Sequence, residues 1–284
     1  MKIKSSKKLG LSLMLSMLMG LLFMSSNALA NNLSITNFRV SDISEANNQI
    51  TFTCDVSWDN SWRNPTNHDA VWVFLKYSAD GGATWNHASM GANGLNPSGF
   101  TIPTGFEVIV PSDETGFFLQ RESIGSGNVT ASSVKFIWDY AQDGLTDDQA
   151  MAANTINKVF GIEMVYVPEG SFYAGDGNSA SEHAFAQGSS DDDPWYIQSE
   201  SAIQTTSSGG DGFYYKSGNS SGENNSGAVF LIPTSFPKGF NDFYQMKYEL
   251  TEGQWVSFFN TLSSSEKSNR DITGIALGGK NTDG

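Results

Sequence analysis

The stretch Ile50–Trp58, with the sequence ITFTCDVSW, alternates apolar and polar residues along its length. Because successive side chains of a strand point to opposite faces, this period of two predicts a β-strand with one buried face. Further short apolar runs come later in the chain, separated by turn-forming Gly, Pro, Asn and Asp, at Val71–Tyr77, Phe106–Val110, Phe117–Gln120 and Val134–Trp138. The pattern predicts that residues 31–143 form a β-sandwich domain of the immunoglobulin-like type.

Cys54 is the only cysteine of the 284-residue chain, and it lies on the apolar side of this strand with Phe52 and Val56. That position is typical of a small buried hydrophobe, so we expect no metal or redox role for its thiol. A single cysteine allows no intrachain disulfide. An exported chain of this composition would therefore depend on its apolar core for stability.

The first 30 residues have the three parts of a secretory signal peptide. Four lysines come first, an apolar run extends from Leu9 to Met24, and Ala28-Leu29-Ala30 is a small-residue cleavage site. We expect cleavage between Ala30 and Asn31, a secreted or periplasmic mature protein, and no membrane span after signal cleavage. An uncleaved membrane anchor is the alternative, although the apolar run is shorter than the ~20 residues of a spanning helix.

The charge of the chain limits its partners. Cleavage would remove four of the 16 basic residues and no acidic one, which leaves 12 basic residues against 30 acidic ones, a net charge of −18. Nucleic acids and anionic membranes bind clustered positive charge, so we exclude both as the main partner. A protein or peptide substrate, or a surface ligand, stays open.

The segment Ser78–Trp85, SADGGATW, fits the S-x-D-x-G-x-T-W pattern known as the Asp box. Asp and Gly favour a tight hairpin turn, beneath which the Trp packs. Sialidase propellers carry several such boxes, whereas this sequence carries one. We therefore interpret the segment as a structural hairpin rather than as a sign of glycosidase activity.

The sequence predicts a linker at residues 144–154, with one helical turn, and a second domain over residues 155–284. That domain opens with a strand, Ile162–Val167, which Pro168 stops. Glu169-Gly170 is predicted to turn the chain into a returning strand.

A long loop is predicted at residues 176–227, which are rich in Ser, Gly, Asn and Asp. Its aromatic residues either anchor the loop or stack on a sugar or peptide. Anchoring is the simpler interpretation.

One clear helix begins after Thr251. Thr251 and Gln254 form a T-x-x-Q capping box, which satisfies amide groups at the start of a helix. The positions i, i+3, i+4 and i+7 are apolar and make one stripe, so we expect a helix of the core; they are Trp255, Phe258, Phe259 and Leu262.

Three segments resemble, in order and residue type, the formylglycine-generating (sulfatase-modifying-factor) family: MVYVPEGSF at 164–172, FPKGF at 236–240 and MKYELTEGQWVSFFNTL at 246–262. In that family a strand delivers Y-E-(V/I/L)-T into a helix of the Q-(W/Y)-x-x-F-(L/F)-N type. The matching residues here are Tyr248, Glu249, Thr251, Gln254, Trp255, Phe258 and Asn260. The resemblance covers about residues 155–270. It implies a C-type-lectin-like α+β domain. A β-sandwich would come before this domain in the chain, and the two would share one strand.

The resemblance leaves two functions open. Enzymatic members bind Cu(I) through two cysteines and oxidise a cysteine of a sulfatase-type peptide to formylglycine, whereas other members are lectin-like binding or surface-assembly proteins. Thiolates select Cu(I), and this chain offers only Cys54. We therefore assign no catalytic, cofactor-binding or metal-binding residue, and we expect copper and calcium only in a longer, full-length protein. The polar stretch after Leu262 predicts that the second domain is truncated here.

The three histidines of the chain, His68, His87 and His183, are far apart in sequence and lack the spacing of metal ligands. A metal site built from them is not expected. The iron-dependent sulfoxide-synthase relatives also fit poorly, because they carry a helical metal-binding domain in front, where this chain carries a sandwich.

Overall fold

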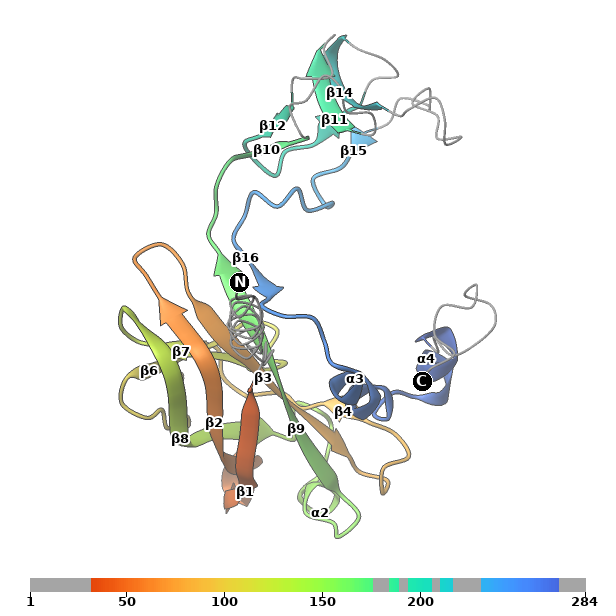
Figure 1. The fold of residues 1–284 in the computed structure, drawn as a ribbon. Helices are drawn as coiled ribbons and strands as arrows, with labels where there is room; N and C mark the ends of the chain where they lie inside the picture. Colours follow the sequence, from red (N-terminus) through yellow and green to blue (C-terminus); the bar gives the residue numbers. More distant parts are fainter. Residues whose placement is uncertain (1–31, 176–183, 189–193, 206–209, 217–230, 271–284) are drawn as a thin grey trace, which may run out of the picture. The chain divides into compact units, whose positions relative to one another are not determined.

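The computed structural model describes residues 32–175, 184–188, 194–205, 210–216 and 231–270. Over these ranges the chain is mostly β, which confirms the predicted fold class (Figure 1). The predicted signal peptide, most of the predicted loop at 176–227 and the end of the chain from residue 271 lie outside the described residues. The immunoglobulin-like and lectin-like types stay predictions.

Two antiparallel sheets enclose the core. The smaller sheet has the order β1-β2-β8, and the larger has the order β16-β9-β3-β7-β6-β5, with β4 also paired to β3. The strands are β1 (Ser34–Ser44), β2 (Gln49–Arg63), β3 (Asp69–Ser78), β4 (Asn86–His87), β5 (Gly94–Leu95), β6 (Phe106–Val110), β7 (Phe117–Arg121), β8 (Gly125–Asp139), β9 (Ile156–Val167) and β16 (Phe243–Met246). All five strands predicted for the sandwich are present.

The core lies between β2 and β8 of one sheet and β3, β6 and β7 of the other. Along β2 the residues Ile50, Phe52, Cys54, Val56 and Trp58 are all buried, and the residues between them in the sequence are polar. The pattern is that of a half-buried strand, as predicted.

Cys54 is fully buried in this core. Burial, helped by the charge of the adjacent Asp55, raises the pKa of its thiol to about 12. The thiol is therefore neutral at physiological pH and packs as a small apolar side chain, which confirms its predicted role.

The strand β9 connects the sandwich to the C-terminal part of the chain. It pairs with β3 from Ser78↔Ile156 to Asp69↔Val165, and with β16 along its other edge. This strand was predicted to open the second domain, and it is the strand that both predicted domains would share. Just before it, residues 144–154 contain the predicted helical turn, α2 (Asp147–Ala150), with a capping box from Thr146 and Gln149.

The predicted hairpin after β9 is wrong. The returning strand β10 (Phe172–Ala174) pairs with β12 (Trp195–Ile197) and not with β9. The reason is that β3 and β16 already occupy both edges of β9, and the amide of Gly170 instead donates to the carbonyl of Phe240 at 3.0 Å. Two further two-stranded pairs are β11 (Ala184–Gly188) with β14 (Gly210–Lys216), and β13 (Ile203–Gln204) with β15 (Leu231–Ile232).

The Asp box forms the predicted hairpin between β3 and β4. The Asp80 carboxylate accepts hydrogen bonds from the Thr84 hydroxyl at 2.6 Å, the Thr84 amide at 2.9 Å and the Ser78 hydroxyl at 2.7 Å. These bonds lower the pKa of Asp80 to about 2. The Trp85 indole closes the turn by donating to the carbonyl of Gly82 at 3.1 Å, and the ammonium of Lys158 lies 4.5 Å from its ring centroid.

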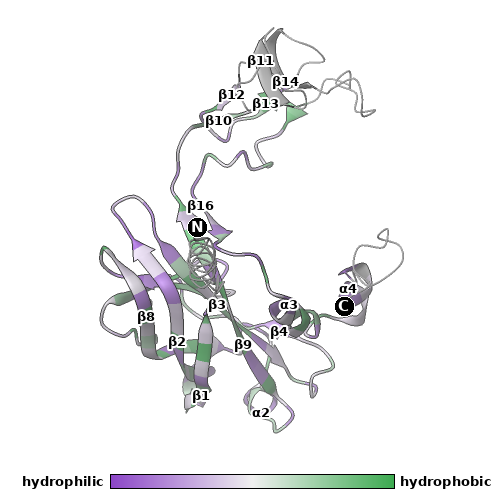
Figure 2. Cartoon of the chain, viewed as in Figure 1, coloured by the Kyte–Doolittle hydropathy of each residue, from purple (hydrophilic) through white to green (hydrophobic). Residues whose placement is uncertain are grey.

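The predicted helix is α3 (Glu252–Phe259), and α4 (Ser264–Arg270) comes after it. Thr251 and Gln254 form the expected capping box. Figure 2 shows both hydrophobic and hydrophilic residues on α3, as in an amphipathic helix. The apolar stripe is only partly covered, since Leu262 is buried but Trp255, Phe258 and Phe259 are half-buried. No residue of α3 itself is buried, and Leu262 lies after the end of the helix, so the prediction of a core helix is wrong for α3.

Substitutions at Gly116, which packs against β3, and at Gly253, in α3, test how tightly the two regions are packed. A Cβ at Gly116 would lie 2.6 Å from the carbonyl oxygen of Val73 and 2.7 Å from Cζ2 of Trp72, so Gly116→Ala should reduce the free energy of unfolding by roughly 1–3 kcal/mol. A Cβ at Gly253, in α3, meets no atom of the described residues within 4 Å, and Gly253→Ala should add up to about 1 kcal/mol. Urea unfolding measures both, and equal stabilities would contradict the packing described.

Candidate functional site

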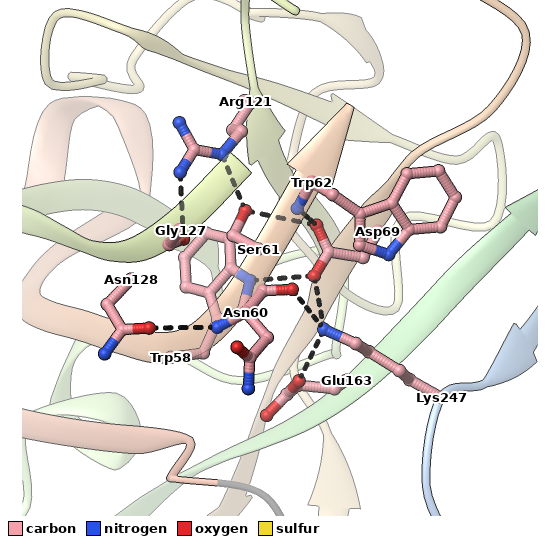
Figure 3. Close-up of polar contacts among 10 residues, drawn as sticks. All are labelled: Trp58, Asn60, Ser61, Trp62, Asp69, Arg121, Gly127, Asn128, Glu163 and Lys247. Atoms are coloured by element: carbon pink, nitrogen blue, oxygen red, sulfur yellow. Dashed lines mark hydrogen bonds and ion pairs between the residues drawn. The ribbon is translucent and has the colours of Figure 1, made fainter. Parts of the chain in front are cut away.

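Three charged side chains are buried together where β16 ends against the sandwich (Figure 3). Asp69 is the first residue of β3, Glu163 lies in the middle of β9, and Lys247 comes directly after β16. Their side chains are 0%, 1% and 10% exposed. The Lys247 amide donates to the Glu163 carbonyl at 2.9 Å, which continues the β16–β9 ladder and brings the lysine side chain over the sheet.

The ammonium of Lys247 lies between the two carboxyl groups. Its Nζ is 2.8 Å from Oδ2 of Asp69 and 3.4 Å from Oε2 of Glu163. It also donates to the Asn60 carbonyl oxygen at 2.9 Å. Asn60 has a φ of +53°, a left-handed conformation that Asn tolerates, at a bulge of β2. The bulge thus re-aims a backbone carbonyl toward the lysine.

The Asp69 carboxylate is held from several sides. Its Oδ1 accepts from the Trp62 amide at 2.8 Å and the Ser61 hydroxyl at 3.1 Å, and its Oδ2 accepts from the Trp58 indole at 3.2 Å. The Arg121 guanidinium donates to the Ser61 oxygen at 2.9 Å, so the Ser61 proton is left to point at Asp69. These donors hold the carboxylate in one orientation independently of its contact with Lys247.

Glu163 is held much less completely. Neither of its carboxyl oxygens has a hydrogen-bond partner among the described residues, and its contact with Lys247 is an ion pair without hydrogen-bond geometry. Burial raises the pKa of Glu163 above its ordinary value, although the charge of Lys247 opposes that rise. Glu163 is thus a buried carboxyl that binds a proton more readily than usual.

Lys247 has the opposite balance. Burial disfavours its ammonium, but the hydrogen bond and charge of Asp69 outweigh burial, and the pKa of Lys247 is raised. The cluster therefore contains an ammonium, a fixed carboxylate and a carboxyl group whose pKa is raised, with the ammonium in contact with both of the others. Such a group can exchange protons internally, away from bulk water.

A second set of contacts anchors β16 beside this cluster. The ring of Tyr244 stacks on Phe118, with centroids 3.7 Å apart. Its hydroxyl donates to Oε1 of Gln120 at 3.1 Å and lies 3.2 Å from Nε2 of His68. The His68 ring stacks in turn on Tyr166 at 4.9 Å. The aromatic contacts and the charge cluster together tie β16 to β3, β7 and β9.

The sequence assigned no site residue, and it did not identify the charge cluster. A signal was present, because Asp69 directly precedes the apolar run AVWVFL and Glu163 interrupts the apolar run GIEMVYV. A charged residue within a buried strand requires a partner. The sequence could not name Lys247 as that partner, since it lies 178 residues from Asp69.

The structure places the described histidines apart. His68 packs on Tyr166, and His87 lies near the ring of Phe74 at 5.5 Å, while His183 is outside the described residues. Within those residues, no group of three or more His, Cys, Asp or Glu side chains has the arrangement of a metal site. The buried Cys54 thiol does not fit copper, which binds the thiolate.

Two apolar surfaces lie outside the charge cluster. A groove of about 440 Å³ runs between α3 and the sandwich, and its lining includes Ile35, Phe74, Phe160, Trp255 and Phe258. Elsewhere, Tyr173 of β10 and Tyr196 of β12 have ring centroids 4.8 Å apart, and both rings are exposed. An exposed aromatic pair is a surface on which a sugar or peptide can stack.

No protein-family model matches this chain, and comparison with curated proteins and with solved structures finds no match either. Within the described residues, none of the helices has the length and apolar character that crossing a membrane requires. The family resemblance therefore rests on the residues that carry it.

Lys247→Met should strongly destabilise the protein, because it leaves Asp69 and Glu163 buried without a positive charge. We expect a loss of about 3–5 kcal/mol in the free energy of unfolding, measured in urea near neutral pH. Lys158→Met removes another lysine of the larger sheet, one whose ammonium lies over Trp85. This control should cost less than about 1 kcal/mol, and a similar loss in both variants would contradict a special role for Lys247.

His68 should make the stability of the protein depend on pH. Burial, and next the charge of Arg63, lower the pKa of His68, while Gln120, Glu107 and Asp69 oppose that shift. The unfolded chain then binds the proton first, so the folded state loses stability as pH falls below about 6.5, the ordinary value for histidine. Between pH 7.5 and 5.5, the stability of His68→Gln should fall less than that of the wild type. Parallel pH profiles from thermal unfolding would contradict this assignment.

Proposed function

We propose that this chain belongs to an exported protein of the formylglycine-generating (sulfatase-modifying-factor) family. In this proposal an immunoglobulin-like β-sandwich is fused through β9 to a C-type-lectin-like domain. The observation that carries the proposal is the passage from β16 into α3. The strand ends at Met246, the residues KYEL come next, and Thr251 caps the helix with Gln254. This is the order of strand, Y-E-L-T and capped helix that the family resemblance implies.

The function that the family implies is oxidation of a cysteine in a sulfatase-type peptide to formylglycine. The described residues would supply the scaffold for this reaction rather than its thiolates. Cys54 cannot serve as a copper ligand without leaving the core, since its side chain is fully buried between the sheets. We therefore derive no catalytic step from the residues described, and copper and calcium stay part of the proposal for the full-length protein.

A second candidate is a lectin-like binding or surface-assembly protein on the same scaffold. The observation that favours it is the pair Tyr173 and Tyr196, whose side chains are exposed although they pack against each other. The Tyr196 hydroxyl donates to the Ser171 hydroxyl at 2.7 Å, which fixes the ring in position. A rigid, exposed aromatic pair loses little conformational entropy when it binds a ligand. The ligand would be a surface sugar or a peptide.

The protein isolated from its own cells, supplied with Cu(I) and oxygen, should convert a sulfatase-type cysteine peptide to an aldehyde. An aminooxy reagent detects the aldehyde, and the same peptide with serine in place of cysteine is the control. Cys54→Ala should leave the rate of aldehyde formation unchanged, because Cys54 packs in the core and ligates no metal. Its expected cost is in stability alone.

The outcomes separate the candidates. Aldehyde formed from the cysteine peptide supports the oxidase. No aldehyde from that peptide, with the protein folded and copper present, would contradict the oxidase and leave the binding role. Loss of aldehyde in Cys54→Ala, with an unchanged melting temperature, would overturn the assignment of Cys54 to the core.

A further inference from the structure

The charge cluster has more order than an ion pair requires. Asp69 is immobilised by three donors besides Lys247, and the ammonium of Lys247 is itself held by the carbonyl oxygen of Asn60, at the bulge of β2. Glu163, in contrast, is buried and without a hydrogen-bond partner among the described residues. Buried carboxyl oxygens are nearly always satisfied, so an unsatisfied one beside a lysine needs an explanation.

The geometry points to an intramolecular amide cross-link between Nζ of Lys247 and Cγ of Asp69, formed by the protein itself with Glu163 as the proton-transfer group. The reacting atoms are already in place, because Nζ is in hydrogen-bond contact with Oδ2, which is bonded to Cγ. Two groups held in this way react as if at a very high local concentration. No other reactant is needed.

The bond changes balance. The ammonium of Lys247 first gives one proton to Asp69 across the 2.8 Å contact, which leaves a neutral amine and a carboxylic acid. The amine nitrogen then forms a bond to Cγ, and the C–Oδ2 bond breaks. Glu163 donates its proton to the departing oxygen and takes one from the nitrogen. Two of the three protons on Nζ thus leave with Oδ2 as one water, and no electron is gained or lost.

The surroundings of Asp69 favour this reaction. When nitrogen adds to Cγ, negative charge develops on Oδ1, and Oδ1 is the atom that faces the Trp62 amide at 2.8 Å and the Ser61 hydroxyl at 3.1 Å. Fixed donors of this kind stabilise the charge that forms in the addition step. Arg121, through its bond to Ser61, keeps the hydroxyl proton directed at Oδ1.

Glu163 has the properties that a proton relay needs. Its Oε2 lies 3.4 Å from Nζ, from which it can take a proton, and burial raises its pKa, which favours the protonated form that can then donate to the departing oxygen. The raised pKa of Lys247 means that its neutral amine is the minor form, so the reaction should be slow and depend on Glu163. The cluster is almost fully buried, and release of water from such a site favours the amide.

The cross-link would stabilise a protein that has a single cysteine. It would close a loop of 178 residues between β3 and the segment directly after β16. A covalent closure of this size restricts the unfolded chain as a disulfide does, without a second thiol. It would also hold β16 and α3 to the sandwich under mechanical load or proteolysis.

Mass spectrometry of the full chain tests the proposal. After incubation at neutral pH, the intact wild type should be lighter than its sequence by one water. A protease digest should contain one branched peptide that joins the Asp69 and Lys247 segments. The branched peptide is needed because Asp-Gly sequences such as Asp143-Gly144 also lose water by closing to a succinimide.

Three variants separate the cross-link from a simple ion pair. Lys247→Arg keeps the positive charge but cannot form the amide, and Glu163→Gln keeps the shape but cannot relay a proton. Both should have their full sequence mass, whereas Lys158→Arg should lose water as the wild type does.

A wild type of full sequence mass would mean an ion pair only and would overturn the proposal, as would water loss that maps to other residues. Water loss by Glu163→Gln at the wild-type rate would overturn the role of Glu163. None of these outcomes depends on sulfatase-type activity.

Discussion

Two buried carboxyl groups share one ammonium group, that of Lys247. The attachment of β16 and the segment after it to the β-sandwich depends on this ammonium. Removing charges from water costs several kcal/mol for each ion, and only close, well-oriented partners offset that cost. Asp69 obtains four donors, while Glu163 obtains one distant ammonium. The asymmetry explains why burial raises the pKa of Glu163. The cluster is therefore stable only while Lys247 stays in place.

The position of Lys247 is itself set by pairing of β16 with β9. The four register pairs from Phe243↔Val167 to Met246↔Met164 are too few to hold a strand against solvent by backbone bonds alone. Stacking of Tyr244 on Phe118 and the contact of Lys247 with Asp69 add side-chain contacts on either side of that short ladder. Every residue of α3 and α4 comes after this anchor in sequence, so the helices start from a fixed point on the larger sheet.

Local features were predictable from the sequence, and distant pairings were not. The alternation of Ile50–Trp58 and the capping box of Thr251 are each set by residues within a few positions of one another, and both were predicted. The pairing of β9 with β3 joins residues that are 78 to 96 positions apart, and the sequence showed only that each was an apolar strand. The predicted hairpin after β9 was wrong for the same reason. The turn residues that follow β9 do not show that β3 and β16 already pair with both of its edges.

The charge cluster shows the same limit at the level of single residues. The sequence could have indicated that Asp69 and Glu163 need partners, since each stands in an apolar strand, but the choice between Lys247 and any other cation is made by the fold. The geometry that makes the Lys247–Asp69 contact a strong ion pair also places an amine against a carboxyl carbon, so the distance alone does not distinguish a stabilising contact from a reactive one.

The environment of Glu163 distinguishes the stabilising role of the cluster from the reactive one. A cluster selected for stability alone would gain by replacing this unsatisfied carboxyl with an apolar or amide side chain, because an orphaned buried acceptor costs about 1–3 kcal/mol. A proton-transfer group, in contrast, must be buried, protonatable and free of competing hydrogen bonds, and the described surroundings of Glu163 meet all three requirements.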